Sequence, residues 1–447
     1  MKKIQWVFSG ILSLSFVPFF LNASQSPISY DDKYMTGDWG GIRSKLKNEG
    51  YDFTLEYGSM VTSNISGGYA KNRTIRYSDQ YIVGIDLDLE KIWNINDGEF
   101  KASVIDRNGR DLTSDRIQDP RAPVIGSSVN SNYGRGQTWH AAQLWYRQSW
   151  FEKTVDLKVG LMPVGEDFDN NGCFFQNLAL CGSLAGHGSG VWYNTPVGQW
   201  GSRLRFNLTP QFYMQTAAFL YNPNYATRSG SFRLDNTGKK GNMYLLELGY
   251  ITSLGPQQLP GSIRLGGWYN TADTNDVLED SDGGAYVLSR KSPRVHNGRY
   301  GTWIYVQQQV IAGKGAPGSG LSFFWHLAMN DRDTATMDYQ TQAGLIYKGL
   351  FAARPMDYIG LGISKIHVNS NVAKRARLMN ERQRITDYND PDWSPIRTAE
   401  YAAELHYSFA ITPWFTFRPN VQVLVHPGGV KEVQDAWVLG SQFIVKM

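Results

Sequence analysis

The chain of 447 residues contains only two cysteines, and charged residues make up only 19% of it. No run of eighteen or more apolar residues occurs after the N-terminal segment, which excludes a bundle of membrane-spanning helices. The mean hydropathy of −0.38 agrees with that exclusion. No basic run with interleaved aromatic residues is present, so we expect no nucleic-acid partner.

The N-terminal segment MKKIQWVFSGILSLSFVPFFLNASQS begins with two lysines, continues with apolar residues and reaches a small residue at Ala23. This order predicts a signal peptide over residues 1–23, although a membrane anchor remains an alternative. Its removal takes away two lysines and leaves 42 basic and 40 acidic residues. Because basic and acidic residues are nearly equal in number, the net charge gives no reason to expect a partner of either sign.

Cys173 and Cys181 lie close together in NGCFFQNLALCGS. An exported chain meets an oxidising compartment, so we expect these two residues to form a disulfide. Two thiolates without a second pair do not fill a tetrahedral zinc site, and the seven histidines are scattered. The sequence therefore predicts no metal and no cofactor.

Most of the chain shows an alternation of apolar and polar residues. In residues 400–425, aromatic and aliphatic side chains occupy one parity, while Glu400, Glu404, His406 and Arg418 occupy the other. A soluble sandwich would bury the apolar face, whereas a barrel in lipid would turn it outward and line a water-filled lumen with the polar face. Bulky apolar residues near aromatic ends favour the barrel, because such residues form interfacial girdles.

Turn residues and alternation together predict a transmembrane antiparallel β-barrel of about 16 strands, with short periplasmic turns and long outer loops. The expected domains are an N-terminal periplasmic segment, 24–50, with a short helix, and a barrel, 51–447. The helix within 37–50 could plug the inner mouth or pack against the rim, and a short turn is expected near 373–384. The expected strands are 51–63, 80–90, 99–108, 139–150, 155–163, 201–209, 211–222, 242–252, 262–270, 301–312, 320–328, 338–348, 357–367, 398–411, 413–425 and 435–447.

Five stretches of the chain are similar to the OprB-type carbohydrate-selective porins. They are TGDWGGIRSKLKNEGYDFTLEYGSMVTSNISGG (36–68), LKVGLMPVGEDFDNNGCFFQNLALCG (157–182), NTPVGQWGSRLRF (194–206), YIGLGISKIHVN (358–369) and the segment from AELHYSFAITPWFTFRPNVQVLVHPGG to the end (403–447). The resemblance implies a bacterial outer-membrane barrel that passes sugars such as monosaccharides by diffusion. It also implies contact with outer-membrane lipid and lipopolysaccharide, and a possible homotrimer.

One position departs from that pattern. Such barrels commonly end in an aromatic residue, whereas this chain ends in Met447. The departure bears on the efficiency of assembly rather than on the fold.

An open barrel of this size needs a loop that narrows it, and 164–200 is the expected constriction loop. Charged groups at inward positions would donate and accept hydrogen bonds to sugar hydroxyls. Trp192, Trp200 and Trp268 could stack on sugars or belong to the girdle. The candidate residues along the substrate path are Glu56, Asp86, Asp88, Arg107, Arg147, Arg205, Glu247, Arg264, Glu400, Glu404 and Arg418.

Three other functions remain open at this point. A general or anion-leaning diffusion porin would share the fold without sugar selectivity. A sealed structural barrel or adhesin would conduct nothing. An enzyme is disfavoured, because GHGSG at 186–190 lacks the spacing of a nucleophile elbow.

Overall fold

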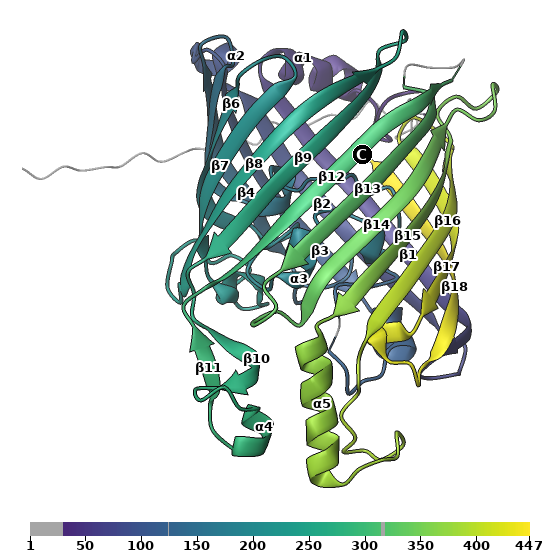
Figure 1. Ribbon diagram of the computed structural model, residues 1–447. Coiled ribbons are helices and arrows are strands. Elements are labelled where there is room, and N and C mark those ends of the chain that lie inside the picture. The colour runs from purple at the N-terminus through teal and green to yellow at the C-terminus, as the bar shows by residue number, and fades with distance from the viewer. Residues whose placement is uncertain (1–29, 124, 314–317) are drawn as a thin grey trace, which may run out of the picture.

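A computed structural model describes residues 30–123, 125–313 and 318–447. The predicted signal peptide, 1–23, lies outside the described residues. Sixteen antiparallel strands close into a barrel, so the predicted fold class is confirmed (Figure 1). Among the described helices, none has the length and apolar character needed to cross a membrane.

The barrel strands follow the predicted alternation closely. They are β1 (Tyr51–Gly68), β2 (Ile75–Asp88), β3 (Gly98–Gly109), β4 (His140–Trp150), β5 (Val155–Met162), β6 (Gln199–Asn207), β7 (Phe212–Tyr221), β8 (Gly241–Leu254), β9 (Leu259–Asn270), β12 (Arg299–Ala312), β13 (Gly320–Asn330), β14 (Met337–Lys348), β15 (Tyr358–Val368), β16 (Ala399–Ala410), β17 (Phe415–Val425) and β18 (Gln434–Lys446). Each strand pairs with its neighbour in the chain, except that β9 pairs with β12, and β18 pairs with β1 to close the sheet.

The five α-helices are short, apart from one outer helix. They are α1 (Ile42–Asn48), α2 (Leu89–Trp93), α3 (Ala185–Gly188), α4 (Tyr286–Ser289) and α5 (Ser370–Gln383). Six further turns are η1 (Trp39–Gly41), η2 (Thr113–Ile117), η3 (Val164–Glu166), η4 (Leu178–Leu180), η5 (Pro223–Ala226) and η6 (Pro427–Gly429).

The exposure of alternate residues along each strand shows which face of the sheet is apolar and which way it points. On β16, Tyr401 and Leu405 point outward and are exposed, whereas Glu400, Glu404 and His406 point inward and are buried. The exposed apolar residues recur around the wall, as a surface in contact with hydrocarbon requires. The charged parity therefore faces the interior of the barrel.

One end of the barrel carries the short turns and the C-terminus. α1 and α2 lie at that end in Figure 1, whereas the long connections leave from the other end. Short turns mark the periplasmic side of such barrels, so the long connections face outward from the cell.

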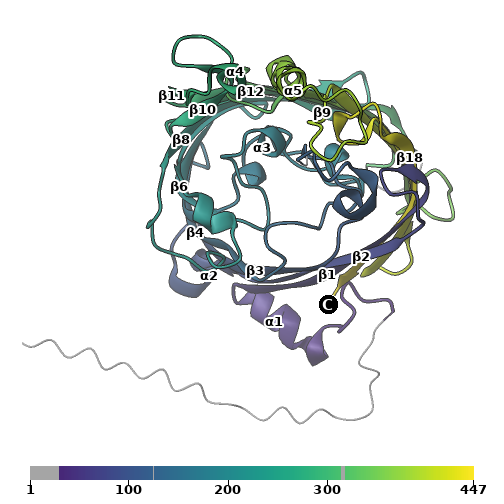
Figure 2. The same cartoon turned by 90° about the horizontal axis from the view of Figure 1, so that it is seen from below.

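The helix α1 lies outside the barrel ring in Figure 2. Arg43 is buried and donates hydrogen bonds to the carbonyl oxygens of Phe53, at 3.0 Å, and Met447, at 2.8 Å. Its guanidinium also stacks over Tyr34, 3.3 Å from the ring centroid. The helix therefore braces the β1–β18 seam and leaves the lumen free.

Two outer elements exceed what the sequence predicted. The connection 271–298 contains a small sheet of β10 (Thr274–Asp280) and β11 (Pro293–His296) rather than an irregular loop. The short turn expected near 373–384 is a helix of 14 residues, α5. Arg375 donates to the carbonyl of Val277, at 2.9 Å, and to the hydroxyl of Tyr286, at 2.8 Å, so that contact between the two loops supports α5 (Figure 1).

Candidate functional site: the interior of the barrel

Two long loops fold back into the barrel, as Figure 2 shows. Loop 110–139 joins β3 to β4, and loop 163–198 joins β5 to β6. Their apolar residues pack on inward side chains of the wall. Leu112, Ile117 and Val129 pack on β17 and β18, and the second loop packs on strands from β4 to β13.

Buried carboxylates of the wall hold loop 163–198 by its backbone. Glu247 on β8 accepts a hydrogen bond from the backbone N–H of Asp169 at 2.9 Å. Glu404 on β16 accepts from the backbone N–H groups of Gln176 and Asn177, at 2.9 and 2.7 Å. Charge-assisted hydrogen bonds of this kind are stronger than neutral ones, so the loop is firmly positioned.

A third anchor uses the side chain of Asp169. It accepts hydrogen bonds from Nε2 of His326, from the hydroxyl of Ser183 at 3.0 Å, and from the backbone N–H of Ala185 at 2.9 Å. Both Asp169 and His326 are fully buried. One loop carboxylate thus joins two parts of its own loop to strand β13.

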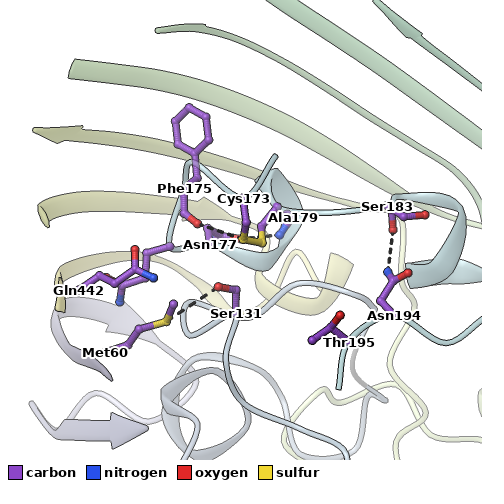
Figure 3. Close-up of a disulfide and its surroundings, with 12 residues drawn as sticks. Met60, Ser131, Cys173, Phe175, Asn177, Ala179, Ser183, Asn194, Thr195 and Gln442 are labelled. Carbon is purple, nitrogen blue, oxygen red and sulfur yellow. Dashed lines mark hydrogen bonds between the residues drawn. A yellow bond between two sulfur atoms is a disulfide. The ribbon is translucent and has the colours of Figure 1, made fainter. Parts of the chain in front are cut away.

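The disulfide between Cys173 and Cys181 lies within the same loop (Figure 3). Gln176 and Asn177, which Glu404 holds, lie inside the ring that the disulfide closes. The expected disulfide is therefore present, and the segment it closes is attached to the barrel wall.

Arg107 connects the wall to both inward loops. It extends from β3 and donates to Oε1 of Gln80 on β2 at 2.8 Å. It also donates to the carbonyl oxygens of Tyr133, in loop 110–139, and Thr195, in loop 163–198, at 3.3 and 3.2 Å. A guanidinium carries five N–H donors, and these three hydrogen bonds use three of them on a side chain that is 9% exposed.

Arg135 lies beside this junction and was not predicted from the sequence. Its guanidinium lies 5.1 Å from the ring centroid of Tyr193, and burial lowers its pKa. No ion pair with a described carboxylate is formed by Arg107 or Arg135, so two cations meet here without local neutralisation. Such an arrangement favours solute oxygen atoms as partners.

Glu166 supplies a loop carboxylate along this wall. It accepts a hydrogen bond from Nε2 of Gln143 at 2.5 Å and lies 3.9 Å from Nζ of Lys158. Burial is the main reason that the pKa of the Glu166 carboxyl is raised. Donors and acceptors therefore alternate along the inner faces of β3, β4 and β5.

Apart from Arg107, which is buried, the predicted path residues on β1 to β7 remain partly open to solvent, but most are paired. Asp86 pairs with Lys101 at 3.0 Å, and Arg147 pairs with Glu99 and Asp156 at 3.2 and 2.6 Å. Asp88 caps α2 at the periplasmic turn, where it accepts from the backbone of Lys91. Glu56 faces Lys446 on β18, and Arg205 stacks on Tyr213 with 3.6 Å to the centroid.

The predicted residues on the opposite wall are closed off from solvent, except for the partly buried Arg264. Glu247, Glu400 and Glu404 are fully buried, and Glu400 accepts a hydrogen bond from the backbone N–H of Gly428 at 2.6 Å. Arg264 stacks on Tyr305 at 4.4 Å, and Arg418 is bonded to Gln442 and Tyr358. These groups hold loops and strands in place rather than face an open passage.

The aromatic candidates show the same division. Trp192 and Trp268 are buried in the apolar cluster between loop 163–198 and the wall. Trp200 packs beside Tyr193 and Val197. Trp192 and Trp268 therefore offer no open ring face to a sugar in this structure, whereas Trp200 is only partly buried.

Comparison with known proteins agrees with this architecture. Residues 72–447 match the family described as carbohydrate-selective porin, OprB family. The chain is 45% identical over 413 residues to Porin B of Pseudomonas aeruginosa, which covers 92% of this chain and 91% of that protein.

Solved structures of a relative show the same fold. The high-pH structure of Pseudomonas putida OprB aligns with a TM-score of 0.91 and 43% identity, over 95% of this chain and all of that one. Its low-pH structure aligns with a TM-score of 0.59 and 30% identity, over 94% of this chain and all of that one. Because the family matches most of the chain and the fold agrees, this bacterial outer-membrane barrel belongs to the OprB family of carbohydrate-selective porins.

Proposed function

We propose that sugars of monosaccharide size cross this porin along the inner faces of β2 to β5, past Arg107 and Arg135. The observation that carries the proposal is the contact of Arg107 with both inward loops, because it marks the point where three segments approach each other. On the opposite side, the inward loops cover the wall and bury its charges. Asp86, Arg147 and Glu166 stay partly exposed on the side of β2 to β5.

The chemistry of this strip suits a neutral polyhydroxylated solute. Guanidinium donors at Arg107 and Arg135 and the acceptor Glu166 can exchange hydrogen bonds with hydroxyl groups as a sugar moves. Loop 163–198, which nearly coincides with the predicted constriction loop 164–200, would set the width of the passage. Of the predicted path residues, Arg107, Asp86 and Arg147 are those that we propose meet the solute, and Glu247, Glu400 and Glu404 act as anchors.

The decisive experiment compares solutes in liposomes that contain the purified porin. Swelling rates are measured for glucose, a disaccharide, an amino acid and an uncharged polyol close to glucose in size. Sugar selectivity predicts faster swelling in glucose than in the matched polyol. Rates that follow solute size alone would establish the general diffusion porin instead.

Three further proposals accompany the channel function. Removal of residues 1–23 on export is tested by N-terminal sequencing of the mature protein. The homotrimer is tested by mass measurement in detergent, where a single-chain mass would contradict it. Transport without catalysis predicts that sugars recovered from the liposomes are chemically unchanged.

A further inference from the structure

Lys365 is the only lysine or arginine at an outward position among the residues of the sixteen barrel strands, all of which the structure describes. It pairs across the sheet with Thr341 on β14 and Tyr401 on β16. Its outward neighbour Ile363 is 58% exposed, which fixes the direction of this parity. A lone cation on the lipid-facing side of a barrel calls for a partner in the membrane.

The depth of Lys365 fits the level of lipid headgroups. It lies near the end of β15, which finishes at Val368 on the outer side. Its Nζ is 5.2 Å from the ring centroid of Tyr339 and 5.8 Å from that of Tyr401. Tyrosines of this kind mark the membrane–water interface, where a lysine costs far less than at the bilayer midplane.

The nearby carboxylate of Asp338 is already paired with other groups. Asp338 lies 2.6 Å from Nδ1 of His367 and 3.5 Å from Nε of Arg332. Lys365 forms no ion pair with any described carboxylate. Its charge therefore remains free for an anion outside the protein.

A groove of about 390 Å³ begins beside Lys365 on the outer face of β13 to β17. The small side chains of Ala343 and Ala403 flank Ile363, one residue pair closer to the bilayer midplane than Lys365. Trp325 and Val423 line the two sides. Lys365 and the groove therefore match the two parts of a lipid. The charge lies at the level of the headgroup, and the apolar groove extends from it toward the bilayer midplane.

We propose that this groove binds one acyl chain of a phosphorylated glycolipid of the outer leaflet, with Lys365 contacting a phosphate. The inference rests on the outer-membrane location and not on sugar passage. A second copy packed face to face is a poorer occupant, because a two-fold contact on this groove would bring two Lys365 charges together. The phosphate of a lipid supplies the opposite charge.

The test is native mass spectrometry of the full mature porin in detergent, titrated with diphosphoryl lipid A and with its phosphate-free form. Lys365→Gln should weaken binding of the diphosphoryl form about fivefold, as expected for one lysine at a membrane surface. Ala403→Leu should fill the groove and weaken binding of both forms. Ala218→Leu, at an exposed outward position of β7, is the matched control and should change nothing.

The outcomes separate the possible occupants. Equal binding by the wild type, Lys365→Gln and Ala403→Leu would overturn the proposal, as would equal affinity of the wild type for both lipid forms. A dimer or trimer mass that Ala403→Leu abolishes would assign the groove to another copy of the chain and also overturn the proposal. Glucose swelling in phospholipid liposomes and heat-modifiable migration on gels show independently that each variant is folded and open.

Discussion

His326 on the barrel wall and Asp169 in loop 163–198 form a hydrogen-bonded pair in which both side chains are fully buried. The Asp169 carboxylate also accepts hydrogen bonds from the hydroxyl of Ser183 and from the backbone N–H of Ala185. The backbone N–H of Asp169 donates a hydrogen bond to the carboxylate of Glu247. Strands β8 and β13 therefore hold the same residue of the loop from two directions.

Removal of the Asp169 carboxylate should release the loop. Asp169→Ala leaves His326 buried without its partner, and loss of one member of a buried pair costs about 3–5 kcal/mol. We expect larger single-channel conductance and faster swelling in a disaccharide, measured in planar bilayers and liposomes. Asp235→Asn, at an exposed outer carboxylate, is the control. An unchanged disaccharide rate would show that this anchor does not set the width.

Arg107 should control selectivity more than conductance. Arg107→Gln removes the guanidinium that reaches both loops and any solute, and one charge-assisted hydrogen bond is worth about 1.5–3 kcal/mol. The ratio of glucose to disaccharide swelling should fall by about tenfold. Arg107→Lys should restore little, because an ammonium cannot span three acceptors. If both variants keep the wild-type ratio of swelling rates, Arg107 does not contact the solute.

The inward direction of these side chains was predictable, but their accessibility was not. Alternation with period two places Glu404 and Arg107 on the face of the sheet that is turned toward the lumen. Whether water reaches them depends on loops distant in the chain. Glu404, for example, is covered by Gln176 and Asn177, which no local pattern links to β16.

The residues that the sequence did not reveal lie mostly in irregular segments. Arg135, Glu166 and Asp169 sit in loops, where no periodicity assigns a direction. His326 carried a usable signal, since it is a single ionisable residue at an inward position in the apolar strand β13. The length of α5 was missed because contacts from residues 277–287 support it, through Arg375 and Arg382.

The disulfide should add to the rigidity of the same loop. Cys173→Ser with Cys181→Ser removes a crosslink of a kind that contributes roughly 2–4 kcal/mol. We expect a broader size cutoff in liposome swelling, though a smaller change than Asp169→Ala produces, since Glu404 still holds the segment between the cysteines. If the cutoff stays the same, the crosslink lies away from the narrowest point.

The thermal stability of the seam between β1 and the C-terminal residue should depend on Arg43. Arg43→Ala removes two hydrogen bonds that close the seam between β1 and Met447, each worth about 1.5–3 kcal/mol with a charged donor. Heat-modifiable migration should shift to lower temperature. Lys45→Ala, on the exposed side of α1, should not shift it. Equal shifts for both variants would mean that the helix as a whole, rather than this contact, stabilises the seam.

His187 should make loop 163–198 sensitive to acid. It is partly exposed within α3, inside the barrel ring, and desolvation by its neighbours lowers its pKa to about 4, although nearby Asp169 opposes the change. An unfolded histidine titrates near 6.5, so the released loop binds a proton that the packed loop excludes. The contribution to stability is therefore complete above about pH 6.5 and is lost as the pH falls toward 4.

Hydrogen exchange of residues 183–190 measures this effect. After correction for intrinsic rates, protection should be lower at pH 5 than at pH 7, by on the order of 1–2 kcal/mol in opening free energy. His187→Gln should abolish the difference, because glutamine does not titrate, whereas His296→Gln in the outer loop should preserve it. A pH dependence that survives in His187→Gln would assign the acid response to other groups of the anchor, of which His326 and Asp169 are the nearest.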